Sequence, residues 1–495
     1  MPLPSVLGSE IEYGITVQGD PDFDPISSCV LLVNAYQDNE EAQILWDYEQ
    51  ENPLADARGF HVEGEKYTPN QQENIARNKT LRNGARFYVD HAHPEYSTPE
   101  VTNVRDLIAY ERAGERTLEA ARRAASALLP AGQTLLIHKN NSDRKGNSYG
   151  NHENYLIERR TPFREIVEHM TPFLITRNVF CGAGKVGSEN RSQQCDYQIS
   201  QRADFFETEV ALDTMVKRPI INTRDEPHAD REKYRRFHVI IGDSNLCEMS
   251  TYLRVGVTSI VLALVEDGAL TRSLAVNDPV KVVKEISHDL ACKRQYPLER
   301  GGRMTAVELQ KELLDCALRY FSSRSLDPIT KDVLVRWERV LAALADDPMQ
   351  LHRELDWVAK HKLIKSYIAR HKVDWHHPQV HMLDLQYHDI RPDKGLFFLL
   401  ERRGEVERVV EPDEIERAVT APPSDTRAYF RGECIRRYPE AVFGVNWDSI
   451  SFNVGEEPIK RILMNEPLKG TRGHVEDLLN ASPTAAVLVR NLTAS

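Results

Sequence analysis

Two carboxylates spaced two residues apart are the first feature of this sequence that suggests chemistry. Residues 6–17 alternate between apolar and polar types, a pattern that predicts a strand. Glu10 and Glu12 then lie on one face of the strand, opposite Leu7 and Ile11. Such a face is often only the solvated side of a sheet, but paired carboxylates also supply the hard oxygen ligands that Mg²⁺ and Mn²⁺ prefer.

A second predicted strand, residues 84–91, carries three more polar side chains on one face. Arg86, Tyr88 and Asp90 are spaced i, i+2 and i+4, so their side chains point the same way. The strand leads directly into residues 91–100, which are rich in polar groups. A carboxylate such as Asp90 can act as a nucleophile or as a general base, and the sequence does not distinguish the two roles.

Two histidines add imidazole groups on further strand-like segments. His152 lies in the run 150–154 and His238 in the run 235–238. Side chains on several strands can converge on one site, and many oxygens with one or two imidazoles favour Mg²⁺ or Mn²⁺ over Zn²⁺. A magnesium ion held by few protein groups usually shares its coordination shell with substrate phosphates, so this set favours a nucleotide as ligand.

Arginines are the side chains expected to contact such phosphates, because the guanidinium fork matches phosphate oxygens. Arg202 and Arg224 are candidates, although a single arginine is more often a surface residue. No P-loop sequence occurs. Gly182–Gly187 fits the dinucleotide pattern G-x-G-x-x-G but lacks the flanking strand and long apolar helix, so we expect no dinucleotide site there.

A second histidine cluster and a tryptophan have plainer interpretations. His376, His377, His381 and His388 lack the spacing of a zinc site, so we expect structural or surface roles for them. Trp447 is by default a core residue of a small domain. The seven cysteines are scattered and include no Cys-x-x-Cys pair, which indicates reduced thiols rather than a disulfide framework or a zinc site.

The elements that must position these side chains follow from periodicity and turn residues. Residues 37–83 are polar and poor in β-branched types, so we expect a long, partly mobile insertion. The Pro-rich run 418–425 is the best linker. Strands followed by helices and strands again favour an α+β fold. Helices are predicted at 104–129, 306–322, 331–345 and 351–371, and further strands at 154–157, 197–200, 237–241, 397–400 and 406–410.

Length and composition bound the class of protein. A chain of 495 residues, 41% of them hydrophobic, can form one large domain and a smaller one, and is not disordered throughout. The net charge of −12 makes nucleic acid a poor default partner. No leader is apparent, and the most apolar stretch, residues 260–265, is too short to cross a membrane. We therefore expect a cytoplasmic protein.

Four longer strings resemble the Pup ligase/depupylase family, which is related to glutamine synthetase and other carboxylate–amine ligases. The similarity covers nearly the whole chain. The long insertion after the first strand is similar to the depupylase branch rather than the ligase branch. The string Asp90–Glu95 is also similar to the depupylase branch, because the ligase has one more residue between its aspartate and His-Pro-Glu. Ser9 stands where relatives often have threonine, a conservative departure. The strings are Gly8–Ile15, Asn83–Glu100, Tyr149–Tyr155 and Leu385–Arg391.

The resemblance implies a fold and a set of site residues. The fold would be α+β: a curved antiparallel sheet cradle like that of glutamine synthetase, backed by helices, in a large domain of residues 1–420. Residues 425–495 would form a small α+β C-terminal domain, and residues 38–82 a long insertion loop near the active site. The cradle would hold ATP (or ADP plus phosphate) and Mg²⁺. The catalytic carboxylate would be Asp90. The metal ligands would be Glu10, Tyr88, Glu95, His152 and His238, with Glu12 a less certain neighbour. The nucleotide contacts would be Thr98, Asn154, Arg202, Arg224, Arg236 and Trp447.

The activity that the resemblance implies is amide hydrolysis. The enzyme would convert the C-terminal Gln of the ubiquitin-like modifier Pup to Glu and cleave the isopeptide bond between Pup and target lysines. Pup and pupylated proteins would be its partners, with a link to the bacterial proteasome pathway. Both reactions break an amide at the same side-chain carbonyl, so one site can serve both. Because amide hydrolysis is downhill in water, ATP would organise the site, or leave a phosphate that takes part in the attack, rather than serve as fuel.

Two alternatives remain open at this point. The first is a ligase that forms the Pup–lysine isopeptide bond through an acyl phosphate. The second is a non-catalytic, nucleotide-dependent module that binds Pup. We also expect residues 38–82 of the insertion to lie over the site and to gate substrate or control nucleotide turnover, because their composition is polar and rich in turn residues.

Overall fold

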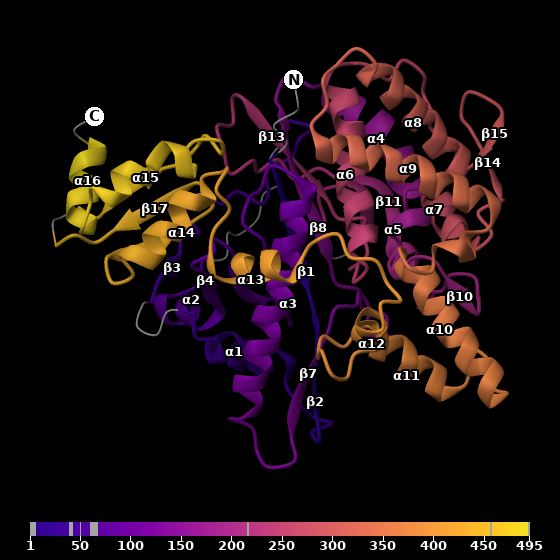
Figure 1. The fold of residues 1–495 in the computed structure, drawn as a ribbon, viewed down its shortest axis with the longest axis horizontal. Coiled ribbons are helices and arrows are strands. Elements are labelled where there is room, and N and C mark those ends of the chain that lie inside the picture. The colour runs from indigo at the N-terminus through magenta and orange to yellow at the C-terminus, as the bar shows by residue number, and fades with distance from the viewer. Residues whose placement is uncertain are drawn as a thin grey trace.

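A six-stranded antiparallel sheet lies at the centre of the computed structural model, in the order β13-β8-β1-β6-β5-β4 (Figure 1). The structure describes residues 6–38, 43–49, 51–59, 68–214, 217–455 and 458–493. The strands of this sheet are β1 (Leu7–Glu12), β4 (Asn78–Thr80), β5 (Arg86–Asp90), β6 (His93–Ser97), β8 (Asn151–Glu158) and β13 (Tyr234–Val239).

One face of this sheet is apolar and packs against helices. Ile11, Phe87 and Tyr96 are fully buried on it, in a core shared with α1 (Pro25–Ala35) and α3 (Val104–Ser126). The alternation of β1 therefore turns its two glutamates to the opposite face, as the sequence predicts. That opposite face is the one that carries the polar side chains of the predicted site.

The opening run of the chain forms two strands rather than the single strand predicted over 6–17. The break falls at Tyr13, whose backbone N–H bonds to the Pro94 carbonyl at 3.0 Å. Beyond it, β2 (Gly14–Gln18) leaves the central sheet and pairs with β7 (Thr134–His138). An alternating pattern does not reveal such a change of partner, because both strands keep the same period.

Helices occupy the part of the molecule on the right of Figure 1. The predicted helices at 306–322, 331–345 and 351–371 are present, the last one starting at Asp356. Among the described residues, α6 is the one helix long and apolar enough to cross a membrane, and 94% of its apolar window is buried inside the protein. The helices of this part are α4 (Phe163–Thr176), α5 (Asn178–Cys181), α6 (Glu248–Glu266), α7 (Pro279–His288), α8 (Ala306–Phe321), α9 (Pro328–Asp346), α10 (Asp356–His371), α11 (Pro378–Tyr387) and α12 (Leu396–Arg402). Helix α13 (Pro412–Thr420) lies apart from them and packs on α3.

Three two-stranded sheets and two 3₁₀ turns complete this part. The sheet of β11 and β12 is parallel, and the other two are antiparallel. Their strands are β9 (Lys185–Val186), β10 (Tyr197–Gln198), β11 (Phe206–Ala211), β12 (Arg218–Asn222), β14 (Gln295–Pro297) and β15 (Arg303–Thr305), and the 3₁₀ turns are η1 (Ala203–Phe205) and η2 (Pro348–Leu351).

Two strand predictions in the second half of the chain are wrong. Residues 397–400 belong to helix α12, and residues 406–410 form no strand. Phe397 and Phe398 are buried in a small core together with Tyr387 of α11. A run of four apolar residues has no period of its own, so its surroundings decide between helix and strand.

The C-terminal residues form a small α+β unit with its own core, at the left of Figure 1. Its four-stranded sheet has the order β18-β17-β16-β3 and includes β3 (Leu45–Trp46), a strand from the predicted insertion that runs parallel to β16. The unit contains α14 (Ala428–Arg437), β16 (Val442–Val445), β17 (Ser449–Phe452), β18 (Lys460–Leu463), α15 (Arg472–Asn480) and α16 (Ala485–Thr493).

The insertion is more ordered than a long loop. Besides β3 it contributes α2 (Gln71–Arg77), which packs on α1, and β4, the edge strand of the central sheet. Residues 39–42, 50 and 60–67 of the insertion lie outside the described residues. The predicted linker also overlaps a helix, because α13 ends at Thr420. The domain boundary at 420–425 stays a prediction.

Candidate active site

The register of the central sheet brings most of the predicted site residues onto one face. In antiparallel pairs, residues directly opposite each other point to the same side. Glu10 on β1 lies opposite His152 on β8 and Ser97 on β6. Glu12 lies opposite Glu95, and Glu95 in turn lies opposite Tyr88 on β5. The same face carries Asp90, Asn154, Arg236 and His238.

Three of these side chains form a group suited to a cation. The ligand atoms of Glu10, His152 and His238 all lie within 4.8 Å of one another, from three adjacent strands. His152 Nδ1 is 3.3 Å from Glu10 Oε2, and the two imidazole rings are 5.1 Å apart. Glu12 is a neighbour rather than a member, with its Oε1 4.0 Å from His152 Nε2.

Asn154 holds two members of this group in place. Its Nδ2 donates to Glu10 Oε1 at 2.9 Å, and its Oδ1 accepts from His238 Nδ1 at 2.8 Å. His238 Nδ1 therefore carries the proton, which leaves Nε2 as the ring nitrogen able to bind a metal. Burial, reinforced by the nearby Arg236 guanidinium, lowers the pKa of His238 well below its ordinary value, so the imidazole is neutral.

Crowded carboxylates on the neighbouring strands fit a bound cation. Glu95 is 3% exposed. Burial and the negative charges of Asp90, Glu12 and Glu10 raise the pKa of Glu95 well above its usual range. Burial and Glu95 likewise raise the pKa of the Tyr88 phenol. A divalent cation among these oxygens would neutralise the repulsion, so the donor set fits the metal site predicted at Glu10, Tyr88, Glu95, His152 and His238.

Asp90 lies at the end of β5, where a two-residue turn leads into β6. Its partner in the register is His93, so His91 and Ala92 form the turn. His91 has φ of +51°, which is unusual for a residue other than glycine, and its Nδ1 donates to Asp90 Oδ2 at 2.9 Å. Burial raises the pKa of the Asp90 carboxyl, but the His91 hydrogen bond and charge outweigh it and leave this pKa below its ordinary value. Asp90 is thus an ionised carboxylate with a side chain 40% exposed.

A cleft opens beside the candidate metal group and follows β1 back towards Leu7. Four of the predicted nucleotide contacts line it: Thr98, Asn154, Arg236 and, from the C-terminal unit, Trp447. Arg236 lies 3.7 Å from Glu10 and 3.6 Å from Glu226, and its Nε and Nη2 atoms are buried without a hydrogen bond. A guanidinium with free hydrogen-bond donors beside apolar walls such as Leu7 and Leu156 fits the phosphate and base of a nucleotide.

The two other predicted phosphate contacts do not line this cleft. Arg224 lies close enough to Arg236 to lower its pKa further, and the Arg224 Nε is also buried without a hydrogen-bond partner. Arg202 is fully buried within reach of the Glu12 charge, and its Nε donates to Ser148 Oγ at 3.2 Å. Arg218 is a neighbour of Arg202 that sequence reasoning missed, because no motif surrounds it.

The glycine-rich run, the second histidine cluster and the cysteines were the other features noted in the sequence. Gly182–Gly187 contains the short strand β9, and the next element along the described chain is β10 rather than a helix. His388 is 1% exposed, donates from Nδ1 to the Lys139 carbonyl at 2.7 Å and accepts from Lys360 Nζ at 2.7 Å. All seven cysteines are free.

A model of one protein family, described as Pup-ligase protein, matches residues 5–451. The chain belongs to this family. The depupylase of Acidothermus cellulolyticus is 50% identical over 499 residues, covering 99% of both chains. The Pup deamidase/depupylase of Mycolicibacterium smegmatis is 45% identical over 99% of both chains. The Pup–protein ligase of Actinosynnema mirum is 42% identical but covers 81% of this chain and 90% of its own.

Two solved structures of the family's ligase PafA are similar to this chain. The complex of PafA with prokaryotic ubiquitin-like protein Pup matches with a TM-score of 0.81 and 31% identity, over 97% of this chain and 91% of PafA. PafA with ADP matches with a TM-score of 0.74 and 33% identity, over 86% and 96%. These matches confirm the predicted family and the predicted α+β fold class.

Proposed function

We propose that this protein is an ATP- and Mg²⁺-dependent amide hydrolase that acts on Pup. It would convert the C-terminal Gln of Pup to Glu and release Pup from target lysines. The observation that carries the proposal is the ionised Asp90 carboxylate on the same sheet face as the Glu10–His152–His238 group, in a chain that matches a depupylase over 99% of both lengths.

The cleft along β1 is the proposed nucleotide site. PafA, a relative with 33% identity, has been solved with ADP. In this chain the Arg236 nitrogens that make no hydrogen bond would face the phosphates, and the Trp447 ring would face the base. Mg²⁺, held by Glu10, His152 and His238, would neutralise phosphate charge and stabilise negative charge that develops on the substrate carbonyl oxygen.

The share of this chain that each relative covers favours hydrolysis over ligation. The depupylases match 99% of this chain, whereas the A. mirum ligase matches 81%. The central carboxylates and imidazoles alone do not separate the two activities, because both act at the same Pup side chain with the same metal and nucleotide chemistry.

Asp90 is the proposed catalytic carboxylate. Held ionised by His91, it would attack the side-chain carbonyl carbon directly or take a proton from the attacking nucleophile. Both roles need a carboxylate without a proton at neutral pH, which is the state the lowered pKa of Asp90 provides. The seven free cysteines support action in a reducing compartment, the cytoplasm, alongside the bacterial proteasome pathway.

Mass spectrometry of Pup ending in Gln tests the proposal. Pup incubated with the protein, Mg²⁺ and ATP should gain about one dalton, the difference between an amide and an acid, and should not do so without nucleotide. Conjugation of Pup ending in Glu to a lysine-bearing protein, with ADP release, would instead show the ligase. Binding of Pup with no change of mass in either assay would leave the non-catalytic module.

A further inference from the structure

Hydrolysis of an amide needs a proton donor as well as a nucleophile and a metal. Attack on the side-chain carbonyl forms the new bond to carbon, and Mg²⁺ stabilises the charge on the oxygen. The nitrogen must receive a proton before its bond to carbon breaks, because an amine leaves as a neutral molecule and not as its strongly basic anion. A proton donor must therefore lie close to Asp90.

His91 follows Asp90 directly, in the turn between β5 and β6. Its Nδ1 bonds to Asp90 Oδ2 at 2.9 Å, so Nε2 is the nitrogen on the far side of the ring. Within the described parts of the chain, this Nε2 makes no hydrogen bond or ion pair, and the His91 side chain is 60% exposed. His91 thus offers one ring nitrogen to a substrate beside the proposed catalytic carboxylate.

Asp90 favours the protonated form of this imidazole. The hydrogen bond from Asp90 and its negative charge outweigh partial burial and raise the pKa of His91, and the charge of Glu12 adds to the effect. A larger share of the ring is therefore an imidazolium at neutral pH than in a free histidine. Such a ring can release its Nε2 proton to an amine nitrogen while Nδ1 stays bonded to the carboxylate.

The other histidines of the cradle face have different partners. His93 stacks on the ring of Tyr149, with centroids 4.2 Å apart, and its Nδ1 donates to the Tyr13 carbonyl at 3.2 Å. His152 and His238 belong to the candidate metal group. These contacts give the three histidines tasks other than proton transfer at the scissile bond.

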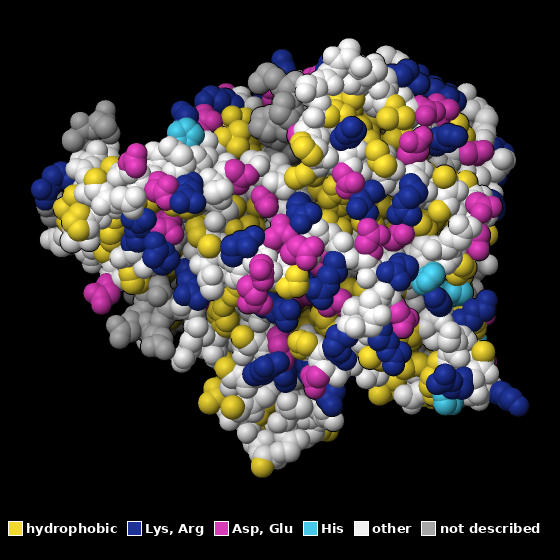
Figure 2. All heavy atoms as spheres, in the orientation of Figure 1, with side chains coloured by type: hydrophobic (Ala, Val, Ile, Leu, Met, Phe, Trp, Pro, Cys, Tyr) yellow, Lys and Arg dark blue, Asp and Glu magenta, His cyan; other side chains and the backbone are white. Residues whose placement is uncertain are grey.

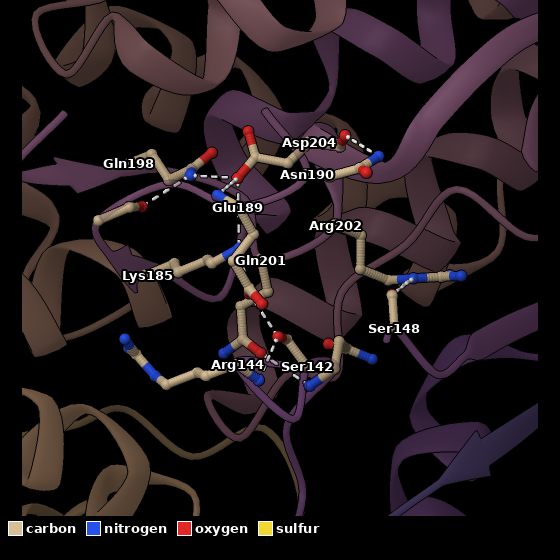
Figure 3. Close-up of polar contacts among 12 residues, drawn as sticks. Ser142, Arg144, Ser148, Lys185, Glu189, Asn190, Gln198, Gln201, Arg202 and Asp204 are labelled. Atoms are coloured by element: carbon tan, nitrogen blue, oxygen red, sulfur yellow. Dashed lines mark hydrogen bonds and ion pairs between the residues drawn. The ribbon is translucent and has the colours of Figure 1, made fainter. Parts of the chain in front are cut away.

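Cationic side chains near the loop before β8 are no better suited. Lys185 Nζ lies 2.6 Å from Glu189 Oε2 and 3.2 Å from Asp204 Oδ2, in the buried cluster that Figure 3 shows. A lysine between two carboxylates holds its proton tightly. Arg202, which lies apart from this cluster in the same view, also keeps its protons at neutral pH.

Exposure of the cradle face increases towards His91. The side chains of Glu12 and Glu10 are 12% and 19% exposed, whereas those of Asp90 and His91 are 40% and 60% exposed. The leaving group in a Pup conjugate is a lysine of a folded protein, which cannot enter a closed cleft. A donor at the open rim, where His91 lies, can reach such a nitrogen.

We propose that His91 is a catalytic residue, whose Nε2–H gives a proton to the leaving nitrogen. The inference rests on the proposed function. Asp90 forms a bond to the carbonyl carbon, the bond from that carbon to nitrogen breaks with its electron pair on nitrogen, and the His91 proton completes the neutral amine. Water then cleaves the acyl–Asp90 anhydride into two carboxylates, and of the two protons released one returns to His91 and the other to the amine.

The same donor serves if Asp90 acts as a general base. Asp90 then takes a proton from water, hydroxide bonds to the carbonyl carbon, and His91 protonates the nitrogen as its bond to carbon breaks. The proton held by Asp90 afterwards passes to His91, which restores the pair. The assignment of His91 is therefore independent of the role that Asp90 takes.

Two Pup substrates that differ only in the leaving group test this assignment. One is Pup ending in Gln, whose leaving group is ammonia. The other is Pup ending in Glu with its side chain esterified to para-nitrophenol, which leaves as a stable anion and needs no proton. We would measure kcat/KM for both substrates with ATP and Mg²⁺ present.

His91→Asn should slow the amide and spare the ester. Asparagine accepts the φ of +51° at this position, so the turn is kept and stability in urea should not fall. The kcat/KM for the amide should decrease about 100-fold or more, the usual size of general acid catalysis, and that for the ester should stay within about threefold.

Chemical rescue and a matched control complete the test. His91→Gly also suits the positive φ, and added imidazole should restore part of its amide turnover because the position is exposed. His376→Asn is the control, since His376 is also an exposed histidine close to an aspartate, 3.6 Å from Asp196, but lies between α10 and α11. It should leave the turnover of both substrates unchanged.

Three results would overturn the assignment. Equal losses on the amide and the ester in His91→Asn would show that His91 only orients Asp90. Amide turnover within about threefold of the unmodified protein would show that the proton comes from elsewhere, and so would a His91→Gly protein that imidazole does not rescue. Turnover of neither substrate by the unmodified protein would count against the proposed function itself, and the role of His91 would fall with it.

Discussion

Carboxylates on one sheet face differ in protonation because their surroundings differ. Asp90, half exposed and bonded to His91, has a lowered pKa, whereas Glu95, buried among other carboxylates, has a raised one. pKa shifts in opposite directions distinguish a carboxylate that reacts from one that needs a nearby cation to become charged. The contrast supports Asp90 as the reacting group and Glu95 as part of the metal's surroundings.

The Asp90→Asn substitution should abolish turnover while leaving ligands bound. An amide can neither attack a carbonyl nor take up a proton, so kcat for Pup deamidation should fall by at least about a thousandfold. Affinities for ADP and Pup, measured by calorimetry, should stay within about threefold. Turnover within tenfold of the unmodified protein would remove Asp90 from the mechanism.

Asn154 should contribute to metal affinity as well as to nucleotide binding. Asn154→Ala removes the hydrogen bonds that orient Glu10 and His238, so Mn²⁺ affinity measured without nucleotide should fall about 10–100-fold. Asn147→Ala, on an exposed part of the loop before β8, is the matched control and should not change it. Equal metal affinity in both variants would mean that Asn154 only lines the cleft.

The sequence predicts the site residues that lie on strands better than those that do not. Glu10, Tyr88 and Asp90 can be placed on one face from their spacing, because the period of a strand is two. Arg202 cannot be placed in this way: it comes from an irregular segment after β10, and only the folded chain brings it within reach of the Glu12 charge and outside the cleft. Arg218 begins the strand β12 and was missed because no motif surrounds it.

At the scale of elements, α3 fixes β6 through one close contact. A Cβ atom built on Gly114 of α3 would lie 2.5 Å from the ring of Tyr96, which is fully buried on β6 next to Glu95. The helix can therefore approach the sheet closely only because residue 114 has no side chain.

Gly114→Ala should destabilise the protein although alanine is the better helix former. The propensity gain is about 1 kcal/mol, whereas overpacking a buried ring costs about 1–3 kcal/mol, so a net loss of up to about 2 kcal/mol is expected in urea unfolding. Gly473→Ala in α15 is the matched control, since a Cβ there meets nothing within 4 Å, and it should be neutral or stabilising. A stabilised Gly114→Ala protein would contradict the close contact.

Long elements are predictable from the sequence and short ones are not. The helix predicted at 104–129 is present as α3. It could be predicted because its apolar residues keep helical spacing over several turns. The run 397–400 is helical, and β3 is two residues long, so neither carries enough residues to show a period. The pairing of β3 with β16 depends on contacts between distant parts of the chain, which local pattern does not contain.

For the whole molecule, the insertion ties the C-terminal unit to the central sheet. β3 pairs with β16, and Trp46 packs edge-on against Trp447 with ring centroids 5.1 Å apart. The Trp46 ring also lies under the guanidinium of Arg86 on β5, 4.0 Å from its centroid. The wall of the cleft that Trp447 forms is thus held from the other side by the insertion.

The Trp46→Ala substitution should weaken nucleotide binding, although Trp46 itself does not contact the nucleotide. Loss of the ring leaves Trp447 unsupported, so ADP affinity should fall about tenfold, and the cavity should cost about 3–5 kcal/mol of stability. Phe443→Ala is the control, because Phe443 lies on the same β16 strand but is 40% exposed. Unchanged ADP affinity in Trp46→Ala would show that Trp447 needs no support from β3.

On the outer surface, basic and acidic side chains are interspersed on the face shown in Figure 2. They are not gathered by sign there, and Asp and Glu exceed Lys and Arg by 75 to 63 over the chain. Any surface that attracts an acidic partner on this face is therefore a local group of side chains rather than a broad basic patch.

The pairing of β3 with β16 also has a consequence for synthesis on the ribosome. About 400 residues separate Trp46 from Val442, so at 5–20 residues per second the strand waits roughly 20–80 s before its partner emerges. During that time β3 lacks its strand partner, and only earlier residues such as Asn74 and Arg86 can contact Trp46. Translation that stops before residue 442 would leave the β16 edge of β3 unpaired, so an unfinished chain and a complete one differ at this edge.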